Sequence, residues 1–225
     1  LALAVCPPLA CEAVESDVPL VARKLVVTRA ETPPVIDGRL DDLCWKLAAV
    51  ARDFSIAEDS QQFHPEQSVG RVCFDEDNIY ISMECTVNEL DKFKARLAAI
   101  NGEFKYGYGG VIEVFIDANH DKKSFQQCLL HANGTSIMTF TEGDVFLTLN
   151  KTYLVSRSQL TDKGYNVEMS FPLAMLHLHP DTTEIWGFNL NRAHDLYDED
   201  VDTNGFFSSW NPTKGMAFGS PELFG

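Results

Sequence analysis

The sequence predicts an all-β fold, namely an antiparallel β-sandwich with one or two short helices. Short runs rich in β-branched and aromatic residues recur at roughly ten-residue spacing, and turn residues separate them. Residues 165–171 alternate apolar and polar side chains, which is typical of a strand with one face in a core. With 225 residues, 45% of them hydrophobic, the chain can form one sizeable core.

The first elements are a strand and a helix. Residues 24–29 are predicted to be a strand because they read KLVVTR. Residues 41–51 are predicted to be a short helix, since Leu43, Leu47 and Val50 recur at helical spacing.

A hairpin follows over residues 68–74 and 79–87. Its register pairs Cys73 with Tyr80, and counting by twos then places Cys73 on the face opposite to Cys85. We therefore expect that these two cysteines do not form a disulfide with each other. Cys85 is expected in the core.

The middle of the chain contains the strongest turn signal, Asn133-Gly134, between two strand-like runs. A proline begins a short helical turn at residues 172–176. The remaining predicted strands are residues 111–117, 124–132, 136–141, 165–171 and 186–191.

The net charge of −15 excludes some classes of partner. Phosphate backbones attract clustered Lys and Arg, so the charge argues against nucleic acid, and it also argues against docking on an anionic membrane. The charge favours solubility and leaves bound cations as a second interpretation. No stretch beyond the N-terminus approaches the roughly 18 apolar residues of a transmembrane span.

The N-terminal segment differs in composition from the rest. Residues 1–10 resemble the tail of a secretory signal, or an apolar arm that packs on a neighbour. We therefore divide the chain into residues 1–22 and a sandwich over residues 23–225, and expect a secreted, periplasmic or cell-surface protein. Asn133 and Asn150 lie in glycosylation sequons, which matter only in a secreted eukaryotic chain.

Several motifs resemble carbohydrate-binding module family 9 and its family-9-like relatives, and they occur in the family's order. The first and most specific is IDGRLDDLCW at residues 36–45. The others are RVCFDEDNIYI at 71–81, IEVFIDAN at 112–119, YNVEMSFP at 165–172, WGFN at 186–189, SWNPT at 209–213 and PELFG at 221–225.

The resemblance implies an immunoglobulin-like β-sandwich that binds sugar, uses calcium as a structural ion and works outside the cytoplasm. In the family, aromatic rings sandwich a sugar at the end of a glycan. A pyranose offers an apolar C–H face to such a ring, while its hydroxyls need oriented polar partners.

The family's stacking rings transfer only in part. The first family tryptophan falls on Gly107, with Tyr106 and Tyr108 beside it, and the second ring falls on Phe218. Trp210 is a further candidate for the rim of the site, with packing in the core as the alternative interpretation.

The family's polar contacts also transfer in part. Glu113 matches the family glutamate and is expected to accept sugar hydroxyls, whereas a family arginine falls on Leu129. Trp45 and Trp186 occupy motif positions that are expected to pack in the core.

Two acidic loops are candidate Ca²⁺ sites because oxygen ligands alternate along them. The alternative is that both are solvated loops. Their ligand candidates are Asp117, Asn119 and Asp121 in the first loop, and Asp198, Asp200, Asp202 and Asn204 in the second.

The sequence therefore predicts a non-catalytic carbohydrate-binding module. The alternative is a structural or assembly domain on the same fold with a degenerate sugar site, which self-associates through an exposed sheet edge or the N-terminal arm. A third hypothesis, haem binding, rests only on the presence of methionine and histidine side chains such as Met83, Met138 and His131.

Overall fold

The computed structural model describes residues 22–57, 59, 61–105, 110–142, 145–148, 154–176, 184–194 and 206–212. The predicted division of the chain at residue 22 stays a prediction. Among the described residues, no helix combines the length and the apolar character that crossing a bilayer requires.

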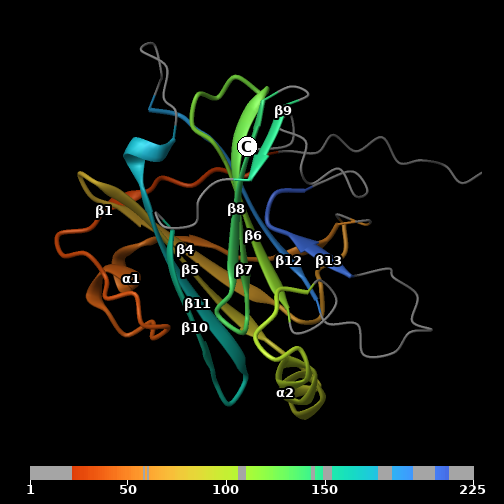
Figure 1. Ribbon diagram of the computed structural model, residues 1–225. Helices are drawn as coiled ribbons and strands as arrows, with labels where there is room; N and C mark the ends of the chain where they lie inside the picture. Colours follow the sequence, from red (N-terminus) through yellow and green to blue (C-terminus); the bar gives the residue numbers. More distant parts are fainter. Residues whose placement is uncertain are drawn as a thin grey trace, which may run out of the picture.

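The described strands form two sheets, which Figure 1 shows as stacked layers. The strands of sheet A are β1 (Thr28–Arg29), β2 (Ala49–Ala51), β4 (Ser68–Phe74), β5 (Asn78–Thr86), β10 (Val155–Leu160) and β11 (Gly164–Pro172). They are ordered β1-β4-β5-β11-β10, and β2 also pairs with β4. The strands of sheet B are β3 (Ser55–Ile56), β6 (Val111–Asp117), β7 (Ser124–His131), β8 (Ser136–Glu142), β9 (Val145–Thr148), β12 (Gly187–Ala193) and β13 (Phe207–Ser209). Their order is β3-β13-β12-β6-β7-β8-β9.

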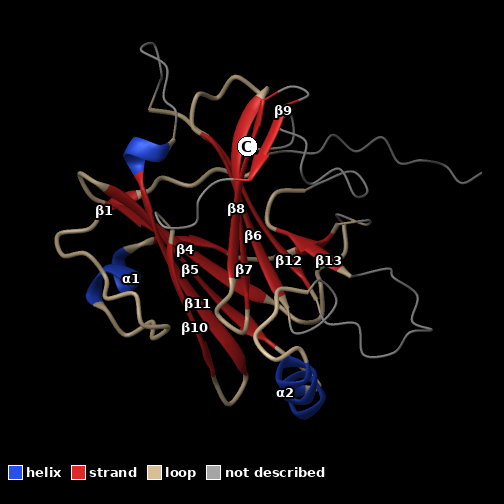
Figure 2. Ribbon diagram, in the orientation of Figure 1, coloured by secondary structure: helices blue, strands red, loops and turns tan. Residues whose placement is uncertain are grey.

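The helices lie outside the two sheets, as Figure 2 shows. They are α1 (Leu43–Leu47), α2 (Leu90–Ala99) and a single 3-10 turn, η2 (Leu173–Met175). The all-β sandwich with short helices is thus confirmed.

The main core lies between the sheets. Alternate residues of β11 point into this core, as their alternation of apolar and polar side chains predicted. Every second residue of β5 and β6 also points into the core and packs there with them. The inward residues of β11 are Tyr165, Val167, Met169 and Phe171.

A second, smaller core covers the outer face of sheet A. The chain from residue 30 to residue 48, here called the lid, packs against β4 and β5 and buries Trp45 together with Cys73 and Tyr80. Trp45 is 2% exposed, so its predicted packing role is confirmed. Trp186 is partly buried against the main core.

The predicted hairpin of β4 and β5 has the expected register. Cys73 pairs with Tyr80. Cys73 lies in the lid core, whereas Cys85 lies in the main core on the other side of sheet A. The expectation that these two cysteines do not pair is confirmed.

Two predicted elements near the N-terminus are wrong in extent. The helix ends at Leu47, and residues 49–51 form β2 instead, because pairing with β4 buries Ala51 completely in the main core. Only two residues of the strand predicted at 24–29 join a sheet, and β1 runs parallel to β4 rather than antiparallel.

Candidate functional site

The outer face of sheet B carries an unusual row of polar side chains, beginning with β6. Ile112, Val114 and Ile116 point into the main core, so the intervening residues point outward. Glu113 is one of these, and it is only 2% exposed. A carboxylate buried this completely needs polar partners.

The strand register places those partners beside Glu113. Asn191 of β12 lies on one side of it and Leu129 of β7 on the other. In the adjacent row, Gln127 of β7 pairs with Thr139 of β8. The amide Nε2 of Gln127 donates a hydrogen bond to Oε2 of Glu113 at 3.4 Å.

Asn191 is held in one orientation by its neighbours. The hydroxyl of Ser209 shares its one hydrogen between Oδ1 of Asn191 at 2.8 Å and the carbonyl oxygen of Asn211 at 2.6 Å, and Asn189 donates its own Nδ2 to that hydroxyl oxygen at 3.0 Å. Because Oδ1 of Asn191 accepts from Ser209, its Nδ2 points elsewhere.

Three buried polar atoms of this face have no hydrogen-bond partner in the described part of the chain. They are Nδ2 of Asn191, Oγ1 of Thr139 and, at the β3 edge opposite Ser209, Oγ of Ser55. Asn191 is fully buried and Thr139 is 3% exposed. Buried polar groups in native proteins are normally paired, so such atoms call for an explanation, and a ligand is one.

Apolar side chains border the polar row. A cluster of Val111, Leu129, Ala193 and Phe207 lies on the same face, and Phe104 and Phe206 pack against it while remaining partly exposed. Gln127 is also partly exposed, so the open side of the face lies over β7. The face thus combines acceptors, donors and partly exposed aromatic rings.

Three of the predicted stacking residues, Tyr106, Tyr108 and Phe218, lie outside the described residues. The described residues on either side of Tyr106 and Tyr108, namely Lys105 and Gly110, are held by hydrogen-bond contacts near the polar residues of sheet B. The carbonyl of Lys105 lies 3.1 Å from Nε2 of His131, and the carbonyl of Gly110 accepts from the amide of Ala132 at 3.1 Å.

The structure does not support a stacking role for Trp210. Since Ser209 points outward toward Asn191, the next residue points inward. Trp210 is 4% exposed, belongs to the main core and packs against Phe188 with ring centroids 6.2 Å apart. It lies on the side of sheet B opposite to Glu113, so the core interpretation is correct.

The first candidate calcium loop uses its carboxylates for its own backbone. Asp117 accepts the amide N–H groups of Asp121 at 3.3 Å and Lys122 at 2.9 Å. Asp121 accepts those of Lys123 and Ser124. Burial raises the pKa of the Asp117 carboxyl.

No group of three or more His, Cys, Asp or Glu residues suited to a metal occurs within the described ranges. The second candidate loop, with Asp198, Asp200, Asp202 and Asn204, lies outside them. Calcium therefore stays a prediction for both loops.

The sequon residue Asn133 is engaged in its hairpin turn. Its Nδ2 donates to the carbonyl of Glu103 at 2.8 Å, and its Oδ1 accepts from the amide of Thr135. Asn150 lies outside the described residues, and glycosylation stays a prediction.

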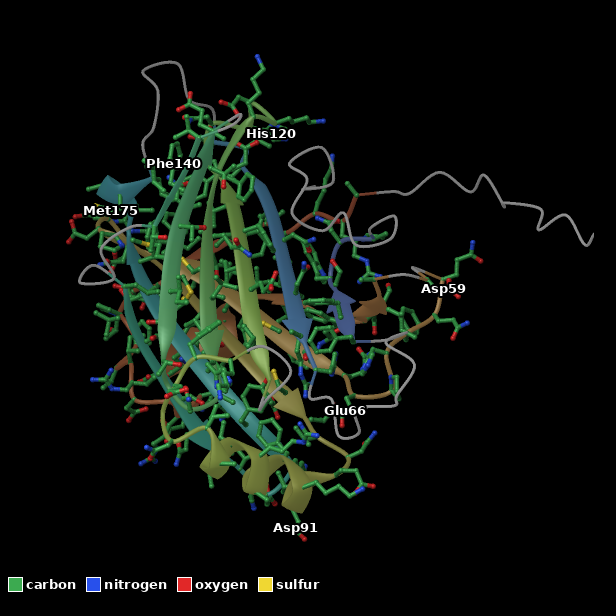
Figure 3. All side chains as sticks on the ribbon, turned by 45° about the vertical axis from the view of Figure 1, so that its right-hand side comes forward. Asp59, Glu66, Asp91, His120, Phe140 and Met175 are labelled. Carbon is green, nitrogen blue, oxygen red and sulfur yellow. The ribbon has the colours of Figure 1, made fainter. Side chains whose placement is uncertain are left out.

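A Ser–His–Glu arrangement is sealed inside the opposite end of the sandwich from the Asp117 loop, as the labels Glu66 and His120 in Figure 3 indicate. His194 contacts the hydroxyl of Ser208 through Nε2 at 2.8 Å and Glu66 through Nδ1 at 3.2 Å. Its ring stacks on His64 with centroids 3.5 Å apart.

This arrangement has the distances of a catalytic triad but lacks access. Unlike the side chains of the outer face of sheet B, Ser208 points between the two sheets and is fully buried, and His194 is 4% exposed, so a substrate carbonyl cannot reach the hydroxyl. Burial, Arg192 and His64 hold the pKa of His194 well below its usual value. The neutral ring therefore serves as a hydrogen-bonded structural element.

Sequence reasoning identified Glu113 but missed Gln127, Thr139 and Asn191. One signal in the sequence was available for Asn191. Asn189 and Asn191 are two residues apart in one strand, so both side chains lie on the same face of that strand, and Glu113 lies on this face when its strand pairs with β12. The pairing of β12 with β6 could not be derived, because these strands are far apart in the sequence.

Comparison with known proteins gives consistent results. A family model described as carbohydrate family 9 binding domain-like matches residues 36–225. The exoglucanase XynX of Acetivibrio thermocellus is 28% identical over 182 residues, which are 80% of this chain but 14% of the exoglucanase. The chain therefore spans only a small part of that relative.

Three solved structures share the fold. Two are of a family 9 carbohydrate-binding module from Caldicellulosiruptor kristjanssonii. The complex with glucose has a TM-score of 0.59 at 17% identity, covering 88% of this chain and 92% of that one. The complex with cellotriose has a TM-score of 0.61 at 16% identity, covering 88% and 89%. A putative carbohydrate-binding protein from Bacteroides uniformis has a TM-score of 0.61 at 12% identity, covering 89% and 95%.

Proposed function

Because the chain belongs to the carbohydrate family 9 binding domain-like family, we propose that it is a non-catalytic carbohydrate-binding module whose site is the outer face of sheet B. Glu113 lies at the centre of this site. Asn191 lies beside it in the same row, and Gln127 and Thr139 lie in the adjacent row of the same face.

The observation that carries this assignment is the pair of unpartnered polar atoms on β12 and β8, Nδ2 of Asn191 and Oγ1 of Thr139. Sugar hydroxyls both donate and accept hydrogen bonds, so they match a donor amide, a hydroxyl and a carboxylate on one face. Binding would satisfy atoms that are otherwise buried without partners.

The apolar part of the face supplies the other half of sugar recognition. Phe104 and Phe206 are partly exposed beside the polar row and offer ring surface to the C–H face of a pyranose. The sequence candidates Tyr106, Tyr108 and Phe218 remain proposed stacking residues.

Glucose units are the proposed ligand class. The two structures of the Caldicellulosiruptor module contain glucose and cellotriose. Since the matched relative is a far longer exoglucanase, we also propose that the module serves a larger carbohydrate-active protein outside the cytoplasm.

The test is a binding titration with cellotriose, glucose and xylotriose by isothermal calorimetry. Thr139→Val removes the hydroxyl at constant shape, and Asn191→Ala removes the amide, so each should weaken binding by about 3- to 10-fold. Glu113→Gln should weaken it by about 10-fold or more, because bonds to a charged acceptor are stronger.

Ser82→Ala is the matched control. Ser82 also has a buried hydroxyl without a partner among the described residues, but it lies on the outer face of sheet A beside Arg71. Its removal should leave affinity unchanged. A folded wild-type chain that retains none of these sugars, or equal losses in Ser82→Ala and Thr139→Val, would contradict the assignment.

Self-association through a sheet edge or the N-terminal arm stays a prediction. Light scattering tests it directly, since a monomer at all concentrations would count against an assembly role.

A further inference from the structure

The four described cysteines, Cys44, Cys73, Cys85 and Cys128, are all free and buried. Cys85 and Cys128 belong to the main core between the sheets. Cys44 and Cys73 belong to the lid core on the outer face of sheet A. The fold thus sorts the cysteines into two pairs on opposite sides of one sheet.

The two lid cysteines share one small buried core although they come from different elements. Cys44 lies in α1 and Cys73 lies in β4, these two elements are in contact, and the two side chains are close enough for each to shift the pKa of the other. Neighbours of both residues, including Trp45 and Tyr80, fill the same small core.

Two buried thiols that neighbour each other across a helix and a strand reach the disulfide bond length of about 2.05 Å by side-chain rotation and a small backbone adjustment. We propose that Cys44 and Cys73 form a disulfide when the chain folds in an oxidising compartment, and that this bond fastens the lid to sheet A.

The chemistry requires an oxidant, and a small-molecule disulfide such as oxidised glutathione supplies it. The Cys44 thiolate attacks one glutathione sulfur and releases one reduced glutathione. Cys73 then attacks the Cys44 sulfur of the mixed disulfide and releases the second. The two thiol protons pass to the two departing glutathione thiolates, so two protein thiols are oxidised and one glutathione disulfide is reduced.

Burial determines when the bond forms. Cys44 is 7% exposed and Cys73 is 1% exposed. Burial raises the pKa of Cys73 to about 12 and also raises that of Cys44, which keeps both as unreactive thiols in the finished fold. The bond therefore forms during folding, before the lid core is sealed.

The consequence is a cross-link on the face opposite to the carbohydrate site. It closes a loop of about 30 residues between α1 and β4, and loops of this size gain appreciable stability from cross-linking. Because the lid contacts sheet A and the sugar site lies on sheet B, oxidation should raise stability without changing sugar affinity.

The test begins with the full chain refolded from denaturant in a glutathione redox buffer, followed by alkylation of free thiols and digestion with trypsin. Cleavage at Lys and Arg leaves Cys44 in the peptide of residues 40–46 and Cys73 in that of residues 72–92. The second peptide also contains Cys85, so the assignment is repeated in Cys85→Ala. We expect these two peptides to be joined, and to separate on reduction.

The second measurement is the melting temperature with and without reductant. Oxidised chain should melt roughly 5–10 °C higher. Cys44→Ala and Cys73→Ala should lose this difference, whereas Cys128→Ala is the matched control and should keep it.

Two outcomes would overturn the proposal: alkylated Cys44 and Cys73 in the refolded wild-type chain, or a link from either residue to another cysteine. The peptide map does not depend on any lid variant folding correctly. Sugar titration of the oxidised and reduced chains then reports separately on the proposed function.

Discussion

Trp45 donates its indole N–H to Oε1 of Glu168 at 2.7 Å. The other oxygen of this carboxylate accepts the backbone N–H groups of Asp37 at 3.0 Å and Gly38 at 2.6 Å. Two motifs that are far apart in the sequence therefore meet at one fully buried carboxylate on the outer face of sheet A. This contact explains why the lid segment needs both its turn and its tryptophan.

Removing that carboxylate should destabilise the protein strongly. Glu168→Ala leaves three donors of the lid without an acceptor, and we expect a loss of about 3–5 kcal/mol in the free energy of unfolding. Urea denaturation followed by tryptophan fluorescence measures it. Glu76→Ala is the control, since Glu76 forms an exposed ion pair with Arg29 whose loss should cost less than about 1 kcal/mol. Similar losses in both variants would show that the buried hydrogen bonds contribute little.

Leu129→Arg should strengthen sugar binding. Leu129 lies directly opposite Glu113 in the strand register, at the position where family relatives are expected to carry an arginine. A guanidinium there adds charged donors next to the polar row, and we expect about 3- to 10-fold tighter binding of cellotriose by calorimetry. Ile137→Arg, one strand further from Glu113, is the matched control. No gain in a Leu129→Arg variant that remains folded would place the sugar elsewhere.

His194 should make the fold sensitive to acid. Its folded-state pKa is lowered by burial first and then by Arg192 and His64, so below about pH 6.5 the unfolded chain binds a proton that the folded chain does not. Its contribution to stability is therefore present above that pH and is lost as the pH falls, by up to about 1.4 kcal/mol per pH unit. Urea unfolding between pH 5.5 and 7.5 measures the slope.

His194→Gln should reduce this slope, because an amide can still contact Ser208 and Glu66 without titrating. An unchanged slope in the variant would assign the acid sensitivity to other groups.

Calcium removal should lower the melting temperature if either acidic loop binds the ion. The oxygens of Asp117 and Asp121 already accept backbone N–H groups, so we expect the second loop to be responsible. The effect of a chelator should then persist in Asp121→Asn and disappear in a variant with Asp200→Asn and Asp202→Asn. A melting temperature that is the same with chelator and with added calcium would reject both loops.

Local patterns predicted the long strands well because each has one face in a core. Residues 165–171 alternate so regularly that both the strand β11 and its inward residues follow from the period of two. The Asn133-Gly134 turn likewise predicted the hairpin of β7 and β8, and Gly134 has the positive φ of 87° that such a turn requires.

The missed elements are short or weakly patterned. β3, β9 and β13 have two to four residues each, and the six-residue β10 is mostly polar and exposed, so pairing with a neighbour rather than local propensity makes all four of them strands. Helix α2 was missed as well; it buries only Phe93 fully, so its apolar face is narrow.

The site could be predicted only where one strand defines it. The position of Glu113 follows from its own strand, but its neighbours come from β7, β8 and β12, and their register depends on the whole sheet. The error at Trp210 has the same origin, because a shift of one residue along a strand moves a side chain to the other face.

The pairing of distant strands also determines how the chain must fold. Cys85 of β5 pairs with Tyr165 of β11, and Glu113 of β6 pairs with Asn191 of β12, so each sheet joins segments about 80 residues apart. Neither sheet can close until most of the chain has been synthesised, and such non-local topology folds slowly. We therefore expect a nascent chain that stays open through most of its synthesis and completes its sheets only afterwards.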